Sequence, residues 1–571
     1  MRGSQLNAPM ERSPARALQS LEALEKTFGN GVAAAKLALL RELAKARLPN
    51  SKQVTRLHES LCFLRAHPDD AAVLAQVEAM LASFARRADL RRFRGDLVDT
   101  GIAGTDLYYP FFASTARWLA ARWPAQMHVD WGWFEGGELL EKRLPWLALY
   151  GETPGLDEVA MPMRKWVARL KGPQETDAEF LIKRFARCGA NDFEREGLFE
   201  ELGLTVRLRA GPTTPSRTRA KLDGRPLHFQ TAPLRRERPD LQRELRIAPR
   251  AVRAVSESDG RRIIDLAREA MVVRSRDLDA FIHGDPRDVR LVDCGGGLEF
   301  ACIGVVPERR LMLESVYAFL TLMNGVPIGY VLISALFGSS EIAYNVFDTW
   351  RGGEAGHVYG RVLALTRHVF GSDTFTIYPY QLGGDGNTEG LKSGSWWFYE
   401  KLGFRARDEK VLALMKRELA TMRRDPRHRS DIATLRKLAK ENVFYSMGRE
   451  RDDIIGVFPL SKVGLAVTDS LAARFGAERE RGELVCADEV ARACGVRAWR
   501  RWPRGEQLWW RRWSPLIAIL PGFERWNPRE RAALVKVVRA KGGRRESDFV
   551  REFDSHRRLR AALVELASGR D

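Results

Sequence analysis

Residues 345–356 read Asn-Val-Phe-Asp-Thr-Trp-Arg-Gly-Gly-Glu-Ala-Gly, and residues 398–404 read Phe-Tyr-Glu-Lys-Leu-Gly-Phe. The first string is a strand end followed by a glycine-rich loop, which residues 355–370 continue at helical spacing. Glycines let a backbone approach a ligand closely, and the amides that open a helix bind phosphate oxygens. The stretch 345–404 therefore predicts a strand–loop–helix unit with a phosphate-binding loop.

The segments around this stretch predict a mixed sheet. Apolar and alternating runs indicate strands over 298–306, 311–322, 328–337, 341–347 and 374–378. Asn324-Gly325 lies between two of these runs and is a strong hairpin signal. Upstream, residues 252–255 are a further strand candidate, and Ser258 is a candidate cap for the helix that follows. The order is strand, helix, antiparallel meander, helix, strand and helix.

This order, together with the two strings, resembles the GNAT superfamily of acyl-CoA-dependent N-acyltransferases over roughly residues 250–410. The resemblance implies acetyl-CoA as co-substrate, held in a splay beside strand 345–347, with its pyrophosphate on the glycine-rich loop. It implies that Tyr399 protonates the departing thiolate, as a phenol can. The residues that it implies for cofactor binding are Val346, Phe347, Arg351, Gly352, Gly353, Ala355 and Gly356.

Two positions depart from the family pattern. The first glycine of the family loop is Glu354 here, and a carboxylate beside a pyrophosphate is unfavourable unless it faces away to support the helix start. The asparagine that the family often places before the tyrosine is Lys392 here, so Asn387 is a substitute only if its loop folds back. The segment 380–394 is also longer and richer in glycine than its family counterpart.

A general base is needed because an amine acceptor is protonated at neutral pH and must lose a proton before it attacks the thioester. Glu341 is our first candidate, since it opens the strand before the loop and bases of this family often lie on that strand. Glu314, Asp348 and His357 are the other candidates. The expected reaction is direct transfer of an acetyl group to an amine in a ternary complex.

The rest of the chain predicts helical regions on both sides of this domain. We expect a mainly helical domain over 1–210, a connector rich in proline and arginine over 211–245, the GNAT-like domain over 246–410, and a mainly helical basic region over 411–571. In the first region, Asp69 or Asp70 is the expected cap of a helix. The expected fold class is α+β, with a central mixed sheet flanked by helices.

Composition limits the class of protein. The chain has 571 residues and a formal net charge of +19, which suggests an anionic partner or simply an arginine-rich composition. The six cysteines show no metal-binding spacing, and no apolar run approaches the ~18 residues of a membrane helix. We therefore expect a cytoplasmic protein with no metal site and no membrane insertion.

One segment leaves a second function open. Residues 498–515 read AWRRWPRGEQLWWRRWSP, and tryptophan interleaved with arginine suits stacking on nucleic acid as well as packing inside a domain. Packing is the favoured interpretation, because so many exposed tryptophans would be costly. The alternative to an enzyme is a non-catalytic GNAT-fold protein that uses basic surfaces to bind nucleic acid or an acidic partner.

Overall fold

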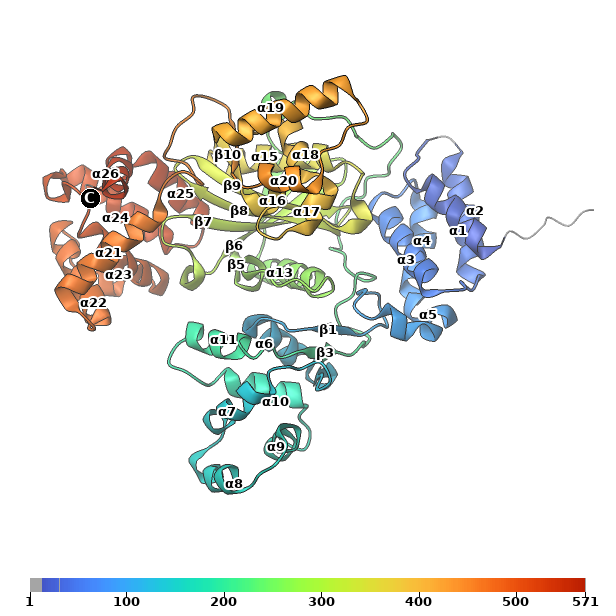
Figure 1. The fold of residues 1–571 in the computed structure, drawn as a ribbon, viewed down its shortest axis with the longest axis horizontal. Helices are drawn as coiled ribbons and strands as arrows, with labels where there is room; N and C mark the ends of the chain where they lie inside the picture. The colour runs from blue at the N-terminus through green and yellow to red at the C-terminus, as the bar shows by residue number, and fades with distance from the viewer. Residues whose placement is uncertain (1–12, 30, 570–571) are drawn as a thin grey trace, which may run out of the picture. The chain divides into compact units, whose positions relative to one another are not determined.

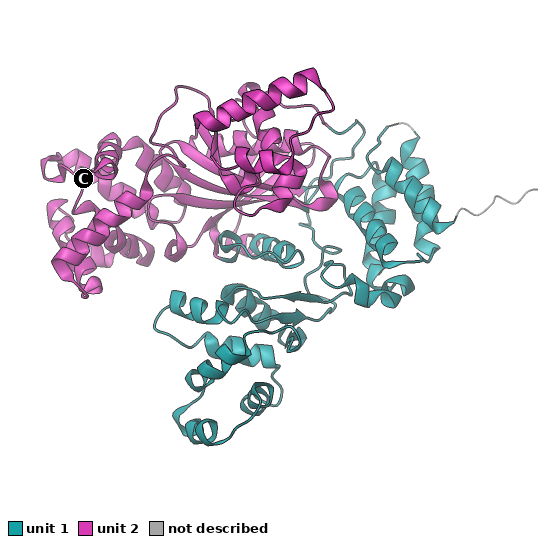
Figure 2. Cartoon of the chain, in the orientation of Figure 1, with its two compact units in different colours: residues 1–234, 262–282, 323–327 teal, residues 235–261, 283–322, 328–571 magenta. Residues whose placement is uncertain are grey.

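The computed structural model describes residues 13–29 and 31–569. The chain forms two compact units (Figure 2). Unit 1 takes the described residues up to 234 together with 262–282 and 323–327, and unit 2 takes 235–261, 283–322 and the described residues from 328 onward. Helices account for 54% and strands for 13%, so the expected α+β class is confirmed. The change of unit at residue 234 falls inside the expected connector.

Unit 1 begins with a helical bundle. Asp70 caps its fourth helix, because its Oδ1 accepts a 2.8 Å hydrogen bond from the amide of Val73. Asp69 instead forms a buried ion pair with Lys36 at 2.8 Å. The helices are α1 (Pro14–Glu25), α2 (Val32–Lys45), α3 (Ser51–Ala66), α4 (Ala71–Ser83) and α5 (Ala88–Arg92).

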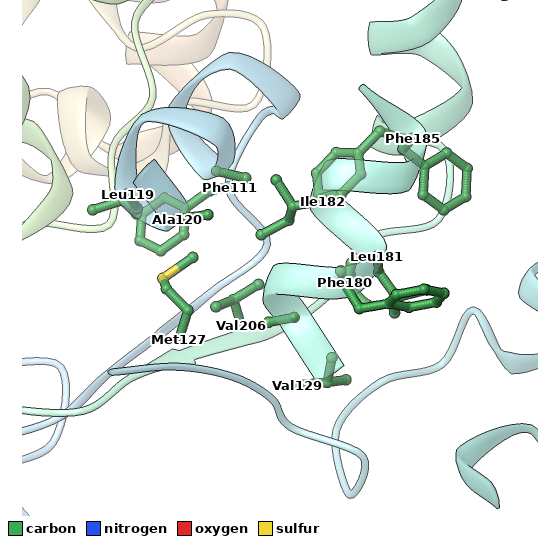
Figure 3. Close-up of a cluster of buried hydrophobic side chains, with 14 of the residues drawn as sticks. Phe111, Leu119, Ala120, Met127, Val129, Phe180, Leu181, Ile182, Phe185 and Val206 are labelled. Atoms are coloured by element: carbon green, nitrogen blue, oxygen red, sulfur yellow. The ribbon is translucent and has the colours of Figure 1, made fainter. Parts of the chain in front are cut away.

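The second part of unit 1 is a small sheet with helices packed on it. Strands β1 (Leu107–Tyr109), β3 (Val206–Leu208) and β2 (Met127–Val129) lie side by side in that order and are antiparallel. Their apolar side chains join one buried cluster with those of the helices (Figure 3). The helices are α6 (Ala113–Arg122), α7 (Gly137–Leu147), α8 (Thr153–Glu158), α9 (Met163–Leu170), α10 (Asp177–Phe185) and α11 (Asp192–Glu200).

Unit 2 is built on a nine-stranded mixed sheet, visible in Figure 1. The strand order across it is β11-β12-β10-β9-β8-β7-β6-β5-β4. Strands β9 and β10 are parallel, whereas β12 runs antiparallel to both β10 and β11. The strands are β4 (Ala251–Ala254), β5 (Gly284–Gly295), β6 (Leu298–Val305), β7 (Ser315–Met323), β8 (Val326–Leu336), β9 (Ser339–Val346), β10 (Thr374–Ile377), β11 (Arg405–Ala406) and β12 (Val443–Ser446).

The local signals of the sequence account for much of this sheet. The hairpin between β7 and β8 is confirmed, with Asn324 at φ 50° and Gly325 at φ 79°, as a type I′ turn requires. The helices that connect these strands, in sequence order between β4 and β12, are α13 (Glu257–Val272), α14 (Asp279–Ile282), α15 (Ala355–Phe370), α16 (Pro379–Leu382), α17 (Thr388–Ser393), α18 (Ser395–Lys401), α19 (Glu409–Arg424) and α20 (Ile432–Leu438).

Three expectations about unit 2 are corrected by the structure. The sheet extends beyond residue 410, because β12 inserts between β10 and β11. Strand β5, which the sequence analysis missed, lies between β4 and β6. The hydroxyl that accepts from the first turn of α13 is that of Ser256, which receives the amide of Asp259 at 3.1 Å, so Ser258 is not the cap.

A helical bundle completes unit 2 beyond the sheet (Figure 1). Most of the tryptophans of the segment 498–515 are core residues, as expected: Trp509, Trp510 and Trp513 are at most 1% exposed. Trp509 and Trp513 also donate hydrogen bonds to carbonyls of the chain before β7. The helices are α21 (Leu460–Phe475), α22 (Arg479–Ala493), α23 (Arg504–Ile517), α24 (Pro528–Lys541), α25 (Glu546–Ser555) and α26 (Arg557–Ser568). Across the described residues, no helix is both long and apolar enough to cross a membrane.

Candidate functional site

Strands β9 and β10 separate partway along their length. Their parallel pairing covers only Ser339 to Glu341 on β9, opposite Thr374 to Thr376 on β10. Strand β9 nevertheless continues to Val346, paired on its other side with Gly329 of β8. Beyond Glu341, one edge of β9 therefore has no partner strand among the described residues.

The backbone of β9 points hydrogen-bonding groups toward this open edge. The amide of Phe347 donates to the carbonyl of Ile328 beside β8 at 2.9 Å. Because successive residues of a strand face opposite edges, the amides of Tyr344 and Val346 face away from β8. The carbonyl of Val346 confirms this direction, since it accepts a 3.2 Å hydrogen bond from Nε of Arg351 in the following loop.

The loop after β9 ends in an open helix N-terminus. Within the loop, the amide of Arg351 donates to Asp348 at 3.1 Å and that of Gly353 to Trp350 at 3.3 Å. The first helical bond of α15 runs from Val358 to the carbonyl of Glu354. Among the described residues, no acceptor is found for the amides of Gly352, Ala355, Gly356 and His357. These amides and the helix dipole favour an anion at this position.

The carboxylate of Glu354 has a partner in the connector. Its Oε1 accepts a 2.9 Å hydrogen bond from the backbone amide of Arg235, which belongs to the connector. Burial, and after it the positive charge of Arg235, lowers the pKa of His357 in the first turn of α15. The carboxylate thus joins α15 to the connector, and the arginine side chain lies near the start of the helix.

The connector also explains two glycines of α15. A Cβ atom on Gly356 would lie 3.3 Å from Cδ of Pro239, and one on Gly360 would lie 3.4 Å from Cβ of the same proline. One turn further on, the buried Arg361 donates to the carbonyl of Ile247 at 3.1 Å. Gly356 therefore has a packing role in addition to its exposed amide.

The side chain of Arg351 forms two ion pairs at the loop. It pairs with Asp348 at 2.9 Å and with Glu389 of α17. Asp348, one of the candidate bases, is exposed and forms an ion pair within its own loop.

Three tyrosines meet beside the open edge of β9. The ring of Tyr359 on α15 lies 5.2 Å from that of Tyr344 on β9 and 5.6 Å from that of Tyr399 on α18. Tyr399 is 3% exposed, and burial raises its pKa above the usual value. The hydroxyl of Tyr344 donates to the carbonyl of Ala355 at 3.2 Å. The sequence-predicted Tyr399 is thus brought to the same edge as the loop.

Two side chains at this site have buried polar atoms without a partner. In the part of the chain that the structure describes, the hydroxyl of Tyr359 and Oδ1 of Asn345 form no hydrogen bond. Buried polar atoms are nearly always hydrogen-bonded, so these positions call for water or a ligand. Nothing in the sequence distinguished Tyr359 from an ordinary core residue of its helix.

Glu341 lies at the point where the two strands part. It is partly buried, and its side chain is on the face of β9 opposite that of Tyr344 because the two are separated by three positions. Burial, and then the negative charge of Glu314, raises the pKa of Glu341 to about 7. Burial likewise raises the pKa of Glu314. A carboxyl group with a pKa near neutrality is suited to accept a proton.

Asn387 has a local structural role. Its Oδ1 caps α17 by accepting the amide of Gly390 at 2.9 Å, and its Nδ2 donates to the carbonyl of Tyr380 at 2.7 Å. Both ends of its amide are therefore used within the segment 380–394. Lys392 is exposed. Over the described residues, no group of three His, Cys, Asp or Glu side chains is placed to hold a metal ion.

Comparison with protein-family models, with curated proteins and with solved structures finds no match for this chain. Its function is therefore inferred from the geometry of the site.

Proposed function

We propose that the protein is an acyl-CoA-dependent N-acyltransferase that transfers an acetyl group to an amine. The observation that carries this proposal is the parting of β9 and β10 after Glu341, directly beside the open N-terminus of α15. Parallel strands that part beside a glycine-rich loop are the arrangement expected of the GNAT fold. The order β9-β10-β12-β11, with an antiparallel strand inserted, also supports membership of that fold.

The cofactor would use groups for which the described part of the chain offers no partner. The amides of Ala355, Gly356 and His357 would bind pyrophosphate oxygens. The amides of Tyr344 and Val346 would bind the carbonyl groups of the pantetheine arm along the open strand edge. The unpartnered hydroxyl of Tyr359 adds a donor beside that edge.

The chemistry would need two proton transfers. Glu341 would take a proton from the ammonium form of the acceptor, whose nitrogen then attacks the thioester carbonyl carbon. As the carbon–sulfur bond breaks, Tyr399 would donate its phenolic proton to the thiolate. The acylated nitrogen would lose its second proton through solvent, which restores the phenol, and Glu341 would release its proton to solvent. Burial raises the pKa of Glu341 toward neutrality, which suits a proton acceptor, and it keeps Tyr399 protonated until the thiolate departs.

Calorimetry with acetyl-CoA tests the proposal. We expect binding with a dissociation constant in the micromolar range, and weaker binding by a Gly352→Pro variant, which replaces the exposed loop residue at φ 72° that proline cannot adopt. Gly371→Pro is the matched control, because it disrupts a glycine of similar φ at the other end of α15. Absence of binding at millimolar acetyl-CoA would refute the proposal.

The alternative is a GNAT-fold binding protein without catalysis. The ion pairs of Arg351 with Asp348 and Glu389 favour it, because they neutralise the cation closest to the loop. Exposed arginines of the connector, Arg235, Arg236 and Arg238, would then contact an acidic partner. A salt-dependent shift of RNA or DNA in a gel, without acetyl-CoA binding, would support this alternative. A cytoplasmic location would suit either function and agrees with six free cysteines.

A further inference from the structure

A cleft of about 320 Å³ lies beside the proposed cofactor loop, within unit 2. One wall is the glycine-rich segment from Gly383 to Leu391, and the other is the end of α20 with Arg436, Ala439 and Lys440. Its size is that of a small ligand site. The family resemblance gave no role to this segment, which is longer than its family counterpart.

The cleft carries positive charge that the protein leaves uncompensated. Arg436 and Lys440 are exposed and form no ion pair or hydrogen bond within residues 13–29 and 31–569. Asp385 also lines the cleft, so its lining side chains sum to one net positive charge. A dianion would be attracted to this wall, whereas a neutral or cationic ligand would gain nothing from it.

Backbone donors face the same space. Asp385 and Gly386 line the cleft with left-handed backbone conformations, at φ 49° and 82°. Their neighbours Gly384 and Asn387 donate their amides within the loop, but no acceptor for the amides of Asp385 and Gly386 is found in the described chain. Two consecutive free amides next to two cations are the donor set of a phosphate site.

The cleft is joined to the loop after β9. Arg351 of that loop pairs with Glu389, which belongs to the same short helix as Thr388 and Leu391 of the cleft wall. This ion pair joins the loop to the wall of the cleft, so we expect a ligand whose pyrophosphate lies on the start of α15 to extend a neighbouring group toward the cleft. In coenzyme A, that group is the phosphate monoester on the 3′ position of the ribose.

We propose that the cleft between residues 383–391 and α20 binds a phosphate monoester, and that this is the 3′-phosphate of acyl-CoA. The identity of the ligand rests on the proposed function, whereas the phosphate site itself rests on the cleft. Arg436 and Lys440 would contact the phosphate oxygens, and the amides of Asp385 and Gly386 would complete the shell.

Calorimetry with acetyl-CoA and with 3′-dephospho-acetyl-CoA tests this inference. The wild-type protein should bind the phosphorylated form about tenfold more tightly, because two charge-assisted contacts are lost without the phosphate. In the double variant Arg436→Gln/Lys440→Gln, the affinities for the two forms should differ by less than about twofold. The affinity for the dephospho form should be unchanged. Lys437→Gln is the control, since this neighbouring exposed lysine does not line the cleft.

Each other result has a distinct meaning. Equal affinity of the wild-type protein for both forms would overturn the inference and leave the proposed function intact. If the double variant lost affinity for both ligands by the same factor, that result would also overturn the inference. If acetyl-CoA does not bind, adenosine 3′,5′-bisphosphate is the probe: binding that depends on Arg436 and Lys440 would retain the phosphate site without the acyltransferase, and no binding would refute both.

Discussion

The backbone amide of Arg235 donates a 2.9 Å hydrogen bond to Oε1 of Glu354, so the carboxylate that replaces a family glycine is directed at the connector. This one contact removes the electrostatic objection to a phosphate at the start of α15. It also places the cationic side chain of Arg235 near the first turn of that helix. Burial is the main cause that lowers the pKa of His357, and the charge of Arg235 is the second.

The Glu354 contact predicts a difference between two substitutions. Glu354→Gln keeps an acceptor oxygen, whereas Glu354→Ala removes it and frees the connector. We expect faster tryptic cleavage after Arg235 or Arg236 in the alanine variant only. Acetyl-CoA affinity should change less than about threefold in both, because the carboxylate is bound to the connector. A gain of about tenfold or more in the glutamine variant would show that the carboxylate opposes the phosphates.

Glu341 predicts a pH dependence of activity. Its carboxylate is the form that accepts a proton, and its pKa is raised to about 7. Acetyl transfer, measured as kcat/KM, should therefore rise with pH up to about 7 and then level off. Glu341→Gln should lower kcat by roughly 100-fold or more and remove the lower limb of the profile. An unchanged profile in this variant would exclude Glu341 as the base.

The same residue predicts a pH dependence of stability. The pKa of Glu341 is raised from 4.5 to about 7 on folding, so its ionisation above pH 4.5 favours the unfolded chain. The stability present below pH 4.5 is lost as the pH rises toward 7. At pH 8, Glu341→Gln should therefore be more stable than wild type by about 2 kcal/mol, and at pH 4 by much less. Denaturant unfolding at both pH values measures this, and an equal difference at both would contradict it.

Removing the hydroxyl group of Tyr399 should affect catalysis, whereas removing that of Tyr359 should affect stability and cofactor affinity. Tyr399→Phe should lower kcat by roughly 100-fold while acetyl-CoA affinity is kept, since the proton is needed only as the thiolate leaves. Tyr359→Phe removes a buried hydroxyl that has no partner in the described chain, so the free protein should gain about 1 kcal/mol of stability. Its acetyl-CoA affinity should fall. Thermal unfolding with and without acetyl-CoA distinguishes the two, and identical behaviour of both variants would contradict this assignment.

The buried ion pair of Lys541 should contribute to the free energy of unfolding, because it joins the C-terminal helices to the sheet. Its Nζ lies 2.5 Å from Glu546 and donates to the carbonyl of Glu314 at 2.7 Å, and both side chains of the ion pair are fully buried. Lys541→Met would leave the buried Glu546 with only the more distant Arg310, whose Nε lies 3.9 Å from its carboxylate, and should cost about 3–5 kcal/mol in urea unfolding. Lys541→Met/Glu546→Gln should recover part of this loss. No recovery would mean that Lys541 contributes through its contact with Glu314.

Some features of the fold follow from short segments of sequence. Asn324-Gly325 predicted a turn that the structure contains, because few other residue pairs adopt left-handed backbone at both positions. The helix expected from Ala355 to Phe370 has these same bounds. The tryptophans near the C-terminus were expected in the core, and the cost of exposing such large apolar side chains explains why Trp509, Trp510 and Trp513 are buried.

Other features depend on parts of the chain that are far apart in sequence. The insertion of β12 beside β10 joins residues that lie on either side of α19 and α20, and no local pattern specifies such pairing. Asn387 was a candidate substitute for the family asparagine only if its loop folded back, and in the structure its amide serves the start of α17. A side chain that can cap a helix is bound by the backbone closest to it.

The sequence by itself determined the elements around the candidate site: the strand before the loop, the glycines, the helix and Tyr399. It did so because propensity, turn geometry and apolar spacing act over a few residues. Only the tertiary structure decided that β9 and β10 part after Glu341 and that Glu354 turns toward Arg235. Strand pairing and the direction of a carboxylate depend on which distant backbone groups remain to be hydrogen-bonded, and those groups are brought together only when the chain has folded.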